Sequence, residues 1–153
     1  MTTTVKQVIA RKGGNVHSVE PDTRLGEVIA IMGEHRIGAI LVSDAGHEVL
    51  GIVTERDCIR EVLWQQRFNA ESRVGDLMRT DIPTVSPRES IQHCMRVMTQ
   101  DRVRHLPVMD EGKLVGVISM GDVINALLSD QRHMIESLEQ YISGSPSIKP
   151  PPH

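Results

Sequence analysis

The stretch that decides the fold is Gly51–Asp57, with the sequence GIVTERD, because a near copy of it returns later in the chain. The second version is Gly116–Asp122, with the sequence GVISMGD, 65 positions further on. Upstream, 19–21 (VEP) returns as 85–87 (VSP) at a shift of 66. Offsets this constant indicate a duplicated unit. The one-residue change in offset falls in the turn between Val42 and Gly51, where the two copies differ in length.

Each copy predicts the same order of elements: strand, helix, strand, strand, helix. In the first copy we expect a strand at 15–19, a helix opened by 21–23, strands at 39–42 and 49–53, and a helix at 54–66. In the second copy we expect a strand at 84–85, a helix opened by a capping box at 86–89, strands at 105–108 and 114–118, and a helix after Ser119.

Neither copy has enough strands to bury its own sheet face, so we expect the two repeats to pack sheet to sheet. The predicted fold class is α/β (α+β), with two pseudo-symmetric repeats and a C-terminal helix. The predicted divisions are a first repeat at 1–66, a linker at 67–73, a second repeat at 74–130, a helical extension at 131–142 and a disordered tail at 143–153. Met134, Ile135, Leu138 and Ile142 form an apolar stripe on the extension, which could cover the chain's own core or a partner helix.

Composition narrows the classes of function. The chain has 153 residues, a net charge of −3 and only three aromatic residues, Trp64, Phe68 and Tyr141. Lys and Arg are spread along the chain, which argues against nucleic-acid binding. No apolar run is long enough to span a bilayer. The first residues lack the pattern of a secretory signal, and we therefore expect a cytoplasmic protein.

Cysteine and histidine spacing predicts no metal or redox site. Cys58 and Cys94 lie in different copies and form no CxxC pair, so they are expected to be reduced residues on helices. The histidines include no HxxxH or HxxEH pair, and we expect no dedicated metal site and no required cofactor.

The repeated Ser/Thr-x-x-Asp pattern carries the functional signal. Thr54 with Asp57, and Ser119 with Asp122, each follow an apolar strand and open a helix. Taken singly, each pair is an ordinary helix cap. Both copies, however, place it at a strand-to-helix turn whose free N–H groups favour anions, and a short carboxylate there suits the two hydroxyls of a ribose. The two roles can coexist in the same side chains.

The two motifs differ in charge. Copy one has Arg56, a planar donor suited to phosphate, where copy two has Gly121. Copy two has the cationic run 102–107 (RVRHLP), whose counterpart, 36–41 (RIGAIL), is far more apolar. The arginines of that run could instead complement a helix dipole. Beside Arg104, His105 becomes a candidate contact for a phosphate or a base.

The duplicated element order, the G-h-h-[ST]-x-x-D motifs and R-H-L-P-V in copy two resemble a tandem pair of CBS (cystathionine β-synthase) domains. Such a pair is called a Bateman module, here of the stand-alone bacterial signalling type, and the resemblance covers about 8–128. It implies adenosine ligands (AMP, ADP, ATP, S-adenosylmethionine or NAD(H)) bound in the clefts between the repeats, and a homodimer. Copy one departs from the family because it lacks the proline of the middle strand and any Arg-His before it.

The resemblance also implies the site residues. Asp57 and Asp122 would hold ribose hydroxyls, with Thr54 and Ser119 on ribose or phosphate. Arg56, Arg104 and His105 would take phosphates. The residues expected to flank or read adenine are Val16, His17, Ile37, Gly38, Ala39, Thr80, Ile82, Pro83 and Val103, and Pro107 and Gly121 complete the predicted nucleotide-binding set.

We therefore expect a non-catalytic regulatory module that binds adenosine nucleotides, AMP foremost, and signals energy or redox state through its dimer to an unknown partner. The alternative is a structural or interaction dimer with vestigial pockets, whose functional surface would be the stripe from Met134 to Ile142. A weaker hypothesis is an enzyme that uses His17, Glu55 or His105 as acid or base.

Overall fold

The computed structural model describes residues 2–14, 16–45 and 48–143. Its helices are α1 (Val5–Lys12), α2 (Leu25–His35), α3 (Glu55–Gln65), α4 (Ile91–Asp101) and α5 (Met120–Ile142), with a 3₁₀ turn, η1, at Val74–Asp76. Its strands are β1 (Ser18–Val19), β2 (Ala39–Ser43), β3 (Val49–Thr54), β4 (His105–Asp110) and β5 (Lys113–Ser119). Within the described ranges, none of the helices has the length and apolarity needed to cross a membrane.

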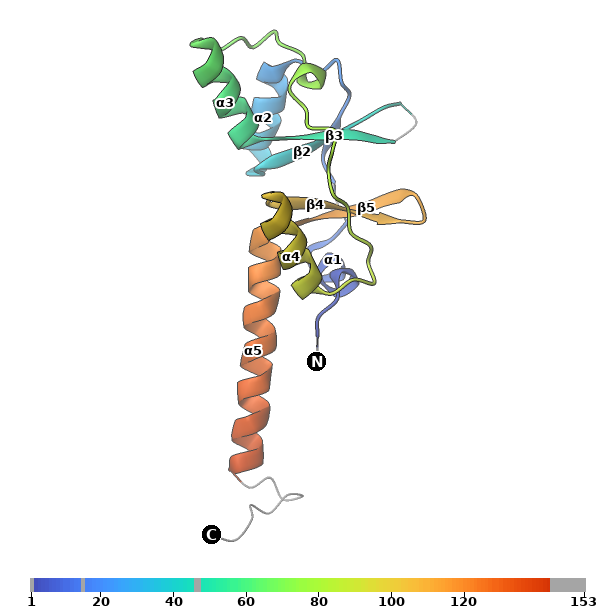
Figure 1. Ribbon diagram of the computed structural model, residues 1–153, viewed down its shortest axis with the longest axis vertical. Coiled ribbons are helices and arrows are strands. Elements are labelled where there is room, and N and C mark those ends of the chain that lie inside the picture. The colour runs from blue at the N-terminus through green and yellow to red at the C-terminus, as the bar shows by residue number, and fades with distance from the viewer. Residues whose placement is uncertain (1, 15, 46–47, 144–153) are drawn as a thin grey trace.

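The strands form two small sheets that confirm the predicted fold class. In the first sheet β1 is parallel to β2, and β2 is antiparallel to β3. In the second sheet β4 and β5 are antiparallel, and the predicted strand at 84–85 is reduced to a single parallel bridge between Val85 and Val108. Figure 1 shows the sheets stacked in the middle of the molecule, with α2 and α3 above them and α1, α4 and α5 below.

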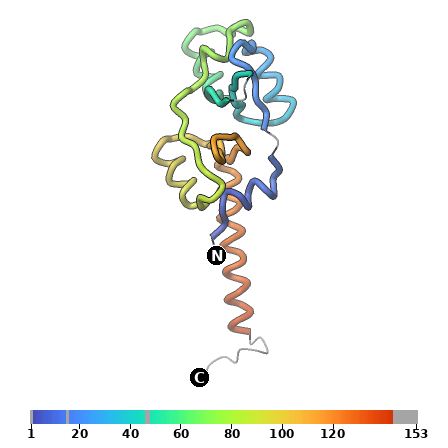
Figure 2. The backbone as a smooth tube through the Cα atoms, turned by 90° about the vertical axis from the view of Figure 1, so that its right-hand side faces the viewer, coloured from blue at the N-terminus to red at the C-terminus, as the bar shows by residue number. Residues whose placement is uncertain are grey.

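The core of each half is completed by the segment that precedes the other half. Val5 and Val8 of α1 are buried among residues of the second repeat such as Leu106, while Val74 of η1 is buried among residues of the first repeat such as Leu25. Figure 2 shows α1, in dark blue, against the lower half of the molecule. The predicted limits at 66 and 74 thus separate the two copies in the sequence, whereas each hydrophobic core contains residues from both sides of these limits.

This exchange moves the start of α2. The carbonyl of Thr23 accepts from the N–H of Val74 at 2.8 Å, and that of Pro21 accepts from Gly75 at 2.9 Å. Residues 21–23 are therefore held in a turn by main-chain bonds to η1. The expectation that they open the helix was wrong, because α2 begins at Leu25.

The start of α4 moves for the same reason. The carbonyl of Glu89 accepts from the N–H of Val5 in α1 at 2.9 Å. The side chain of Glu89 does bond back to the N–H of Ser86 at 2.8 Å, as in a capping box, but this box closes a turn and not a helix. The predicted helix start at 86–89 was wrong, because α4 begins at Ile91 with Ser90 as its N-cap.

We call α1 and η1, with the residues that follow each of them, the leading segments of the first and second repeat. Two equivalent glycines let each leading segment cross a strand of the other repeat. A Cβ on Gly51 in β3 would lie 2.7 Å from the carbonyl oxygen of Arg79, and one on Gly116 in β5 would lie 2.7 Å from Cδ1 of Ile9. The backbone of Arg79 exchanges two hydrogen bonds with Ile52, of 2.9 and 3.0 Å. Glycine at both positions brings each leading segment directly onto the sheet of the other half.

The C-terminal helix α5 runs without a break from Met120 to Ile142, so the predicted extension at 131–142 continues the helix of the second repeat. Its lower part projects away from both sheets (Figure 1). Met134, Ile135, Leu138 and Ile142 are 55–73% exposed, so this stripe does not cover the chain's own core. Of the predicted tail, Ser143 caps α5, and 144–153 lie outside the described residues.

Candidate functional site

The repeated motif forms two matching helix caps. In the first repeat the carboxylate of Asp57 accepts from the N–H of Thr54 at 2.9 Å, and the hydroxyl of Thr54 accepts from the N–H of Asp57 at 3.2 Å. In the second repeat Asp122 and Ser119 form the same reciprocal pair at 2.8 and 3.1 Å. The capping interpretation is thus confirmed for both motifs, and it leaves carboxylate oxygen lone pairs available for other donors.

Each motif is joined to the start of the middle strand in its own repeat. The N–H of Glu55 donates to the carbonyl of Gly38 at 3.0 Å, and the N–H of Met120 donates to the carbonyl of Arg104 at 2.8 Å. Gly38 and Arg104 are themselves equivalent positions, 66 residues apart. The two strand-to-helix turns that carry the motifs therefore have the same local backbone arrangement.

The first motif opens onto a cleft of about 680 Å³ between the repeats, which we call the larger cleft. It joins Thr54 and Asp57 of the first repeat to Ile82 and 103–105 of the second. The predicted residues that line it are Gly38, Thr54, Arg56, Asp57, Ile82, Val103, Arg104 and His105. Its volume lies within the usual range for small-molecule sites.

Five arginines line the larger cleft: Arg56, Arg60, Arg79, Arg102 and Arg104. Four acidic residues line it as well, namely Glu55, Asp57, Asp81 and Asp101, so the cleft offers both donors for an anion and acceptors for hydroxyl groups. The site prediction lacked Arg60, Arg79 and Arg102. Arg60 could have been found, because it lies one helical turn after Arg56 on the same face of α3. Arg79 enters only through its backbone pairing with Ile52, a contact that the sequence pattern does not reveal.

The second motif borders a smaller cleft of about 240 Å³. It joins Ser119 of the second repeat to residues of the first, so both clefts combine the motif of one repeat with the leading segment of the other. The predicted residues that line it are Val16, His17, Ile37, Gly38, Ala39, His105 and Ser119. The ring of His17 stacks on that of His35, with centroids 4.1 Å apart.

Five residues of the predicted set line neither cleft. Thr80 and Pro83 flank lining residues of the larger cleft, Pro107 pairs with Val117 inside the second sheet, and Gly121 lies in the first turn of α5. The fifth is Asp122, which lines a separate depression that shares Lys12 with the smaller cleft.

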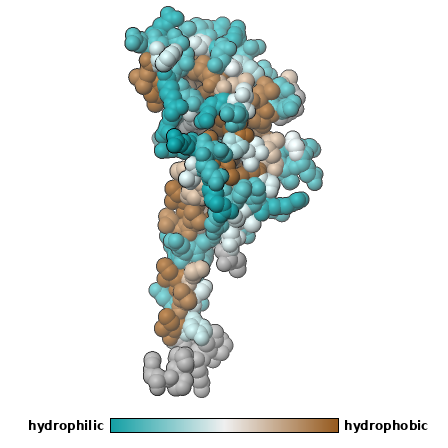
Figure 3. All heavy atoms as spheres, in the orientation of Figure 1, coloured by the Kyte–Doolittle hydropathy of each residue, from teal (hydrophilic) through white to brown (hydrophobic). Residues whose placement is uncertain are grey.

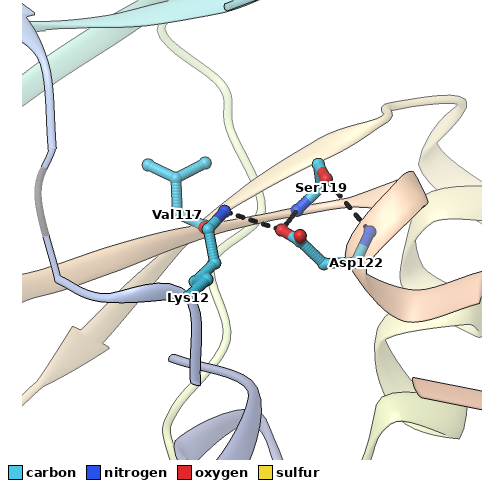
Figure 4. A network of polar contacts seen from close by, with 4 residues as sticks. All are labelled: Lys12, Val117, Ser119 and Asp122. Atoms are coloured by element: carbon cyan, nitrogen blue, oxygen red, sulfur yellow. Dashed lines mark hydrogen bonds and ion pairs between the residues drawn. The ribbon is translucent and has the colours of Figure 1, made fainter. Parts of the chain in front are cut away.

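Lys12, at the end of α1, is the residue that covers Asp122. Its ammonium group donates to Asp122 at 2.7 Å and to the carbonyl of Val117 at 2.9 Å (Figure 4). Burial by itself would raise the pKa of Asp122, but the hydrogen bonds from Lys12 and Ser119 outweigh it and leave that pKa below its usual value. Sequence reasoning missed Lys12, because only the exchange of α1 brings it to the second repeat.

His105 lines both clefts. Burial lowers its pKa, the nearby Lys12 adds to this effect, and Asp122 and Glu55 oppose it. The lowered pKa favours the neutral imidazole, and among the described residues its buried Nδ1 has no hydrogen-bond partner. A neutral imidazole can offer a hydrogen bond to a ligand.

Two arginines occupy backbone positions where glycine is usual. Arg36 ends α2 with φ of 54°, and Arg102 ends α4 with φ of 55°. They are equivalent in the two repeats, and each lines one cleft: Arg36 the smaller, Arg102 the larger. A left-handed backbone is unfavourable for a residue with a Cβ, so these two cleft residues adopt it at some cost in stability.

The cysteines lie away from this chemistry. Cys58 and Cys94 are buried and free, as expected. Burial raises the pKa of Cys94 to about 11, with a smaller contribution from Glu89, and burial likewise raises that of Cys58. Neither thiol is a reactive thiolate at neutral pH.

Comparison with known proteins identifies the family. The sequence model of the CBS domain matches twice, at residues 5–63 and 74–129. The chain belongs to the CBS domain family. This CBS pair is 31% identical over 151 residues to the mitochondrial CBS domain-containing protein CBSX3 of Arabidopsis thaliana, covering 94% of this chain and 73% of that protein.

Solved structures agree with this assignment. A protein with CBS domains from Burkholderia ambifaria is 40% identical, with a TM-score of 0.79 over 84% of this chain and 96% of that one. A CBS domain pair solved in complex with methylthioadenosine and S-adenosyl-L-methionine has a TM-score of 0.73 over 86% of this chain and 99% of its own, at 21% identity. At that identity the likeness shows a shared fold.

Proposed function

We propose that this CBS pair is a non-catalytic regulatory module that binds adenosine nucleotides between its repeats and signals energy or redox state through a homodimer. AMP is the first candidate, with ATP, ADP, NAD(H) and S-adenosylmethionine as alternatives. The observation that carries the proposal is the larger cleft, where Asp57 at the start of α3 lies among five arginines. A carboxylate accepts from ribose hydroxyls, and guanidinium groups donate to phosphate.

The apolar lining of the larger cleft supports an adenine ring. Ile52, Ile59, Ile82 and Val103 line it together with the charged residues. Aliphatic side chains on either side of a flat ring bury both of its faces, while polar groups fix its orientation. The solved CBS pair that holds two adenosine compounds supports the same ligand class for this fold.

Thermal unfolding of nucleotide-free protein tests the proposal, with AMP, ADP, ATP, NAD+, NADH and S-adenosylmethionine each added with and without Mg²⁺. A ligand at about 100 times its Kd should stabilise the fold by roughly 2.7 kcal/mol. Asp57→Ala should clearly reduce the shift, and Asp57→Ala combined with Asp122→Ala should abolish it, whereas Asp110→Ala, which removes a carboxylate outside both clefts, should retain it. Recovery of the ligand unchanged after incubation tests the non-catalytic part. A flat response to every compound contradicts the proposal.

A second candidate function is a structural or interaction dimer with vestigial pockets. It is favoured by exposed apolar side chains on one side of the molecule: Ile59, Leu63 and Trp64 of α3, and Leu128, Ile135, Leu138 and Ile142 of α5. Figure 3 shows apolar residues along this side of the long helix. A protein that forms dimers but gives no ligand response, whether or not Asp57 and Asp122 are replaced by alanine, would establish this reading. The cytoplasmic location stays a prediction.

A further inference from the structure

The two repeats of this pseudo-symmetric molecule differ in the surroundings of the motif aspartate. Asp57 lines the larger cleft directly, and it forms the two hydrogen bonds of its own helix cap. Asp122 has the same cap but also receives the ammonium group of Lys12 at 2.7 Å, and it does not line the smaller cleft. The carboxylate that would hold a ribose is therefore open in one repeat and occupied in the other.

The hydrogen bond from Lys12 to Val117 shows why the lysine stays there. Val117 is the equivalent of Ile52, 65 residues earlier. The carbonyl of Ile52 accepts from the main chain of Arg79 at 2.9 Å, while that of Val117 accepts from the side chain of Lys12 at 2.9 Å. In the second repeat a mobile side chain thus replaces a fixed backbone donor, and the same ammonium group bridges to the carboxylate.

The size and charge of the smaller cleft fit this difference. Its volume of about 240 Å³ is below the usual range for a site that encloses a small molecule, whereas the larger cleft lies within it. Hydroxyls of a ribose can reach Asp122 only if they displace Lys12, and the neutral sugar must then replace an ion pair. Because Lys12 remains 37% exposed, this displacement is feasible with a modest loss of affinity.

We propose that Lys12 acts as an internal competitor for Asp122, so that the two clefts bind adenosine ligands with unequal affinity and the Thr54–Asp57 cleft fills first. This inference rests on the proposed adenosine binding and adds a specificity-determining residue to it. Lys12 sets the ratio of the two affinities, which decides whether the molecule responds to its ligand in one step or in two.

Isothermal titration calorimetry with AMP, ATP or S-adenosylmethionine as separate probes tests this inference. Wild-type protein should bind first at one site, with the second site weaker by roughly tenfold or more, the value of one charge-assisted hydrogen bond. Lys12→Met removes the charge and keeps the length of the side chain, and should tighten the second site by roughly tenfold. Lys6→Met makes the same change on an exposed position of α1 and should alter neither Kd.

Aspartate variants assign the two sites, and they test the predicted order of filling even if Lys12→Met fails to fold. Asp57→Ala should remove the tight site, and Asp122→Ala should remove the weak one. The inference is overturned by equal affinities in the wild type, by loss of the tight site in Asp122→Ala, or by weaker binding in Lys12→Met, which would make Lys12 a ligand contact. Failure of every probe to bind overturns the proposed function itself.

Discussion

At the scale of single residues, Arg36 and Arg102 combine a left-handed backbone with a place at a cleft. Three helices of the described chain end on a left-handed residue that is not glycine: Arg36, Gln66 and Arg102. The two arginines line the clefts and Gln66 does not. The same backbone strain thus occurs at cleft residues and at Gln66, which lies outside both clefts. Substitutions at the two kinds of position can therefore separate the effect of the strain on stability from the effect of the side chain on binding.

We predict that Arg102→Gly stabilises the fold and weakens ligand binding. Glycine adopts φ of 55° without a Cβ clash, which should raise the free energy of unfolding by about 1 kcal/mol. Loss of the guanidinium group should lower the affinity for AMP or ATP at the larger cleft. Urea denaturation and calorimetric titration measure the two effects.

Gln66→Gly is the matched control for this prediction. It relieves the same backbone strain at a position outside both clefts, and should give a similar gain in stability with an unchanged Kd. If Arg102→Gly also left the Kd unchanged, Arg102 would have no part in binding.

The residues of the candidate site that sequence predicted are those whose signal is local. Thr54 and Asp57 carry a helix cap that repeats at a fixed spacing, and Arg56 lies between them. Lys12 and Arg79 escaped prediction, because each reaches its position through contact with the other repeat. No periodicity within a repeat encodes a contact of that kind.

At the scale of elements, the exposed stripe of α5 has the spacing of a helix-pairing seam. Leu128, Ile135 and Ile142 recur every seven residues, with Leu138 between the last two. In an antiparallel pair Arg132 would lie opposite Glu139 of the partner subunit, since both occupy the same flanking position of the heptad. A parallel pair would place Gln131 against its own copy in the seam. Charge complementarity therefore favours antiparallel pairing of two copies.

We predict that the chain forms such a dimer and that Leu138→Glu dissociates it. Each dimer would lose two buried leucines, at a cost of roughly 3 kcal/mol or more. Sedimentation velocity over a range of concentrations measures the change. Gln140→Glu introduces the same charge on the opposite face of α5 and should leave the dimer intact. A monomeric wild-type protein, or equal effects of the two variants, would refute pairing along this stripe.

Helices and strands were predicted well where no tertiary hydrogen bond competes with the local sequence pattern. Both middle hairpins and both helices after the motifs lie where the sequence places them. The starts of α2 and α4 were misplaced, because Pro21 and Pro87 favour a first helical turn, yet their carbonyls bond to the leading segment of the other half. A tertiary hydrogen bond here outweighs a local capping preference.

At the scale of the whole molecule, the exchange of α1 and η1 makes two small cores into one folding unit. The repeat and the sheet-to-sheet packing could be predicted, because each copy has too few strands to bury a face. The exchange of α1 and η1 could not be predicted, since the apolar side chain of Val5 would fit either core equally well. Only the three-dimensional course of the chain decides which core it enters.

We predict that Val5→Ala and Val74→Ala each destabilise the entire chain. Both residues are fully buried, and deletion of two methyl groups from a close-packed core costs roughly 1–3 kcal/mol. Because each valine completes the core of the other repeat, both variants should shift a single unfolding transition in urea. Lys6→Ala, on the exposed face of α1, should have little effect. Separate transitions for the two repeats would contradict this coupling.

The exchange of leading segments also bears on how the duplication is maintained. A cut in the peptide between Gln66 and Arg73 would leave α1 on one fragment and the core it completes on the other, and the reverse for η1. Each fragment would lack part of its own interior, yet the mixture would contain everything needed for reassembly. The two repeats are therefore obligate complements, and loss of either by deletion would strand the other as an incomplete protein.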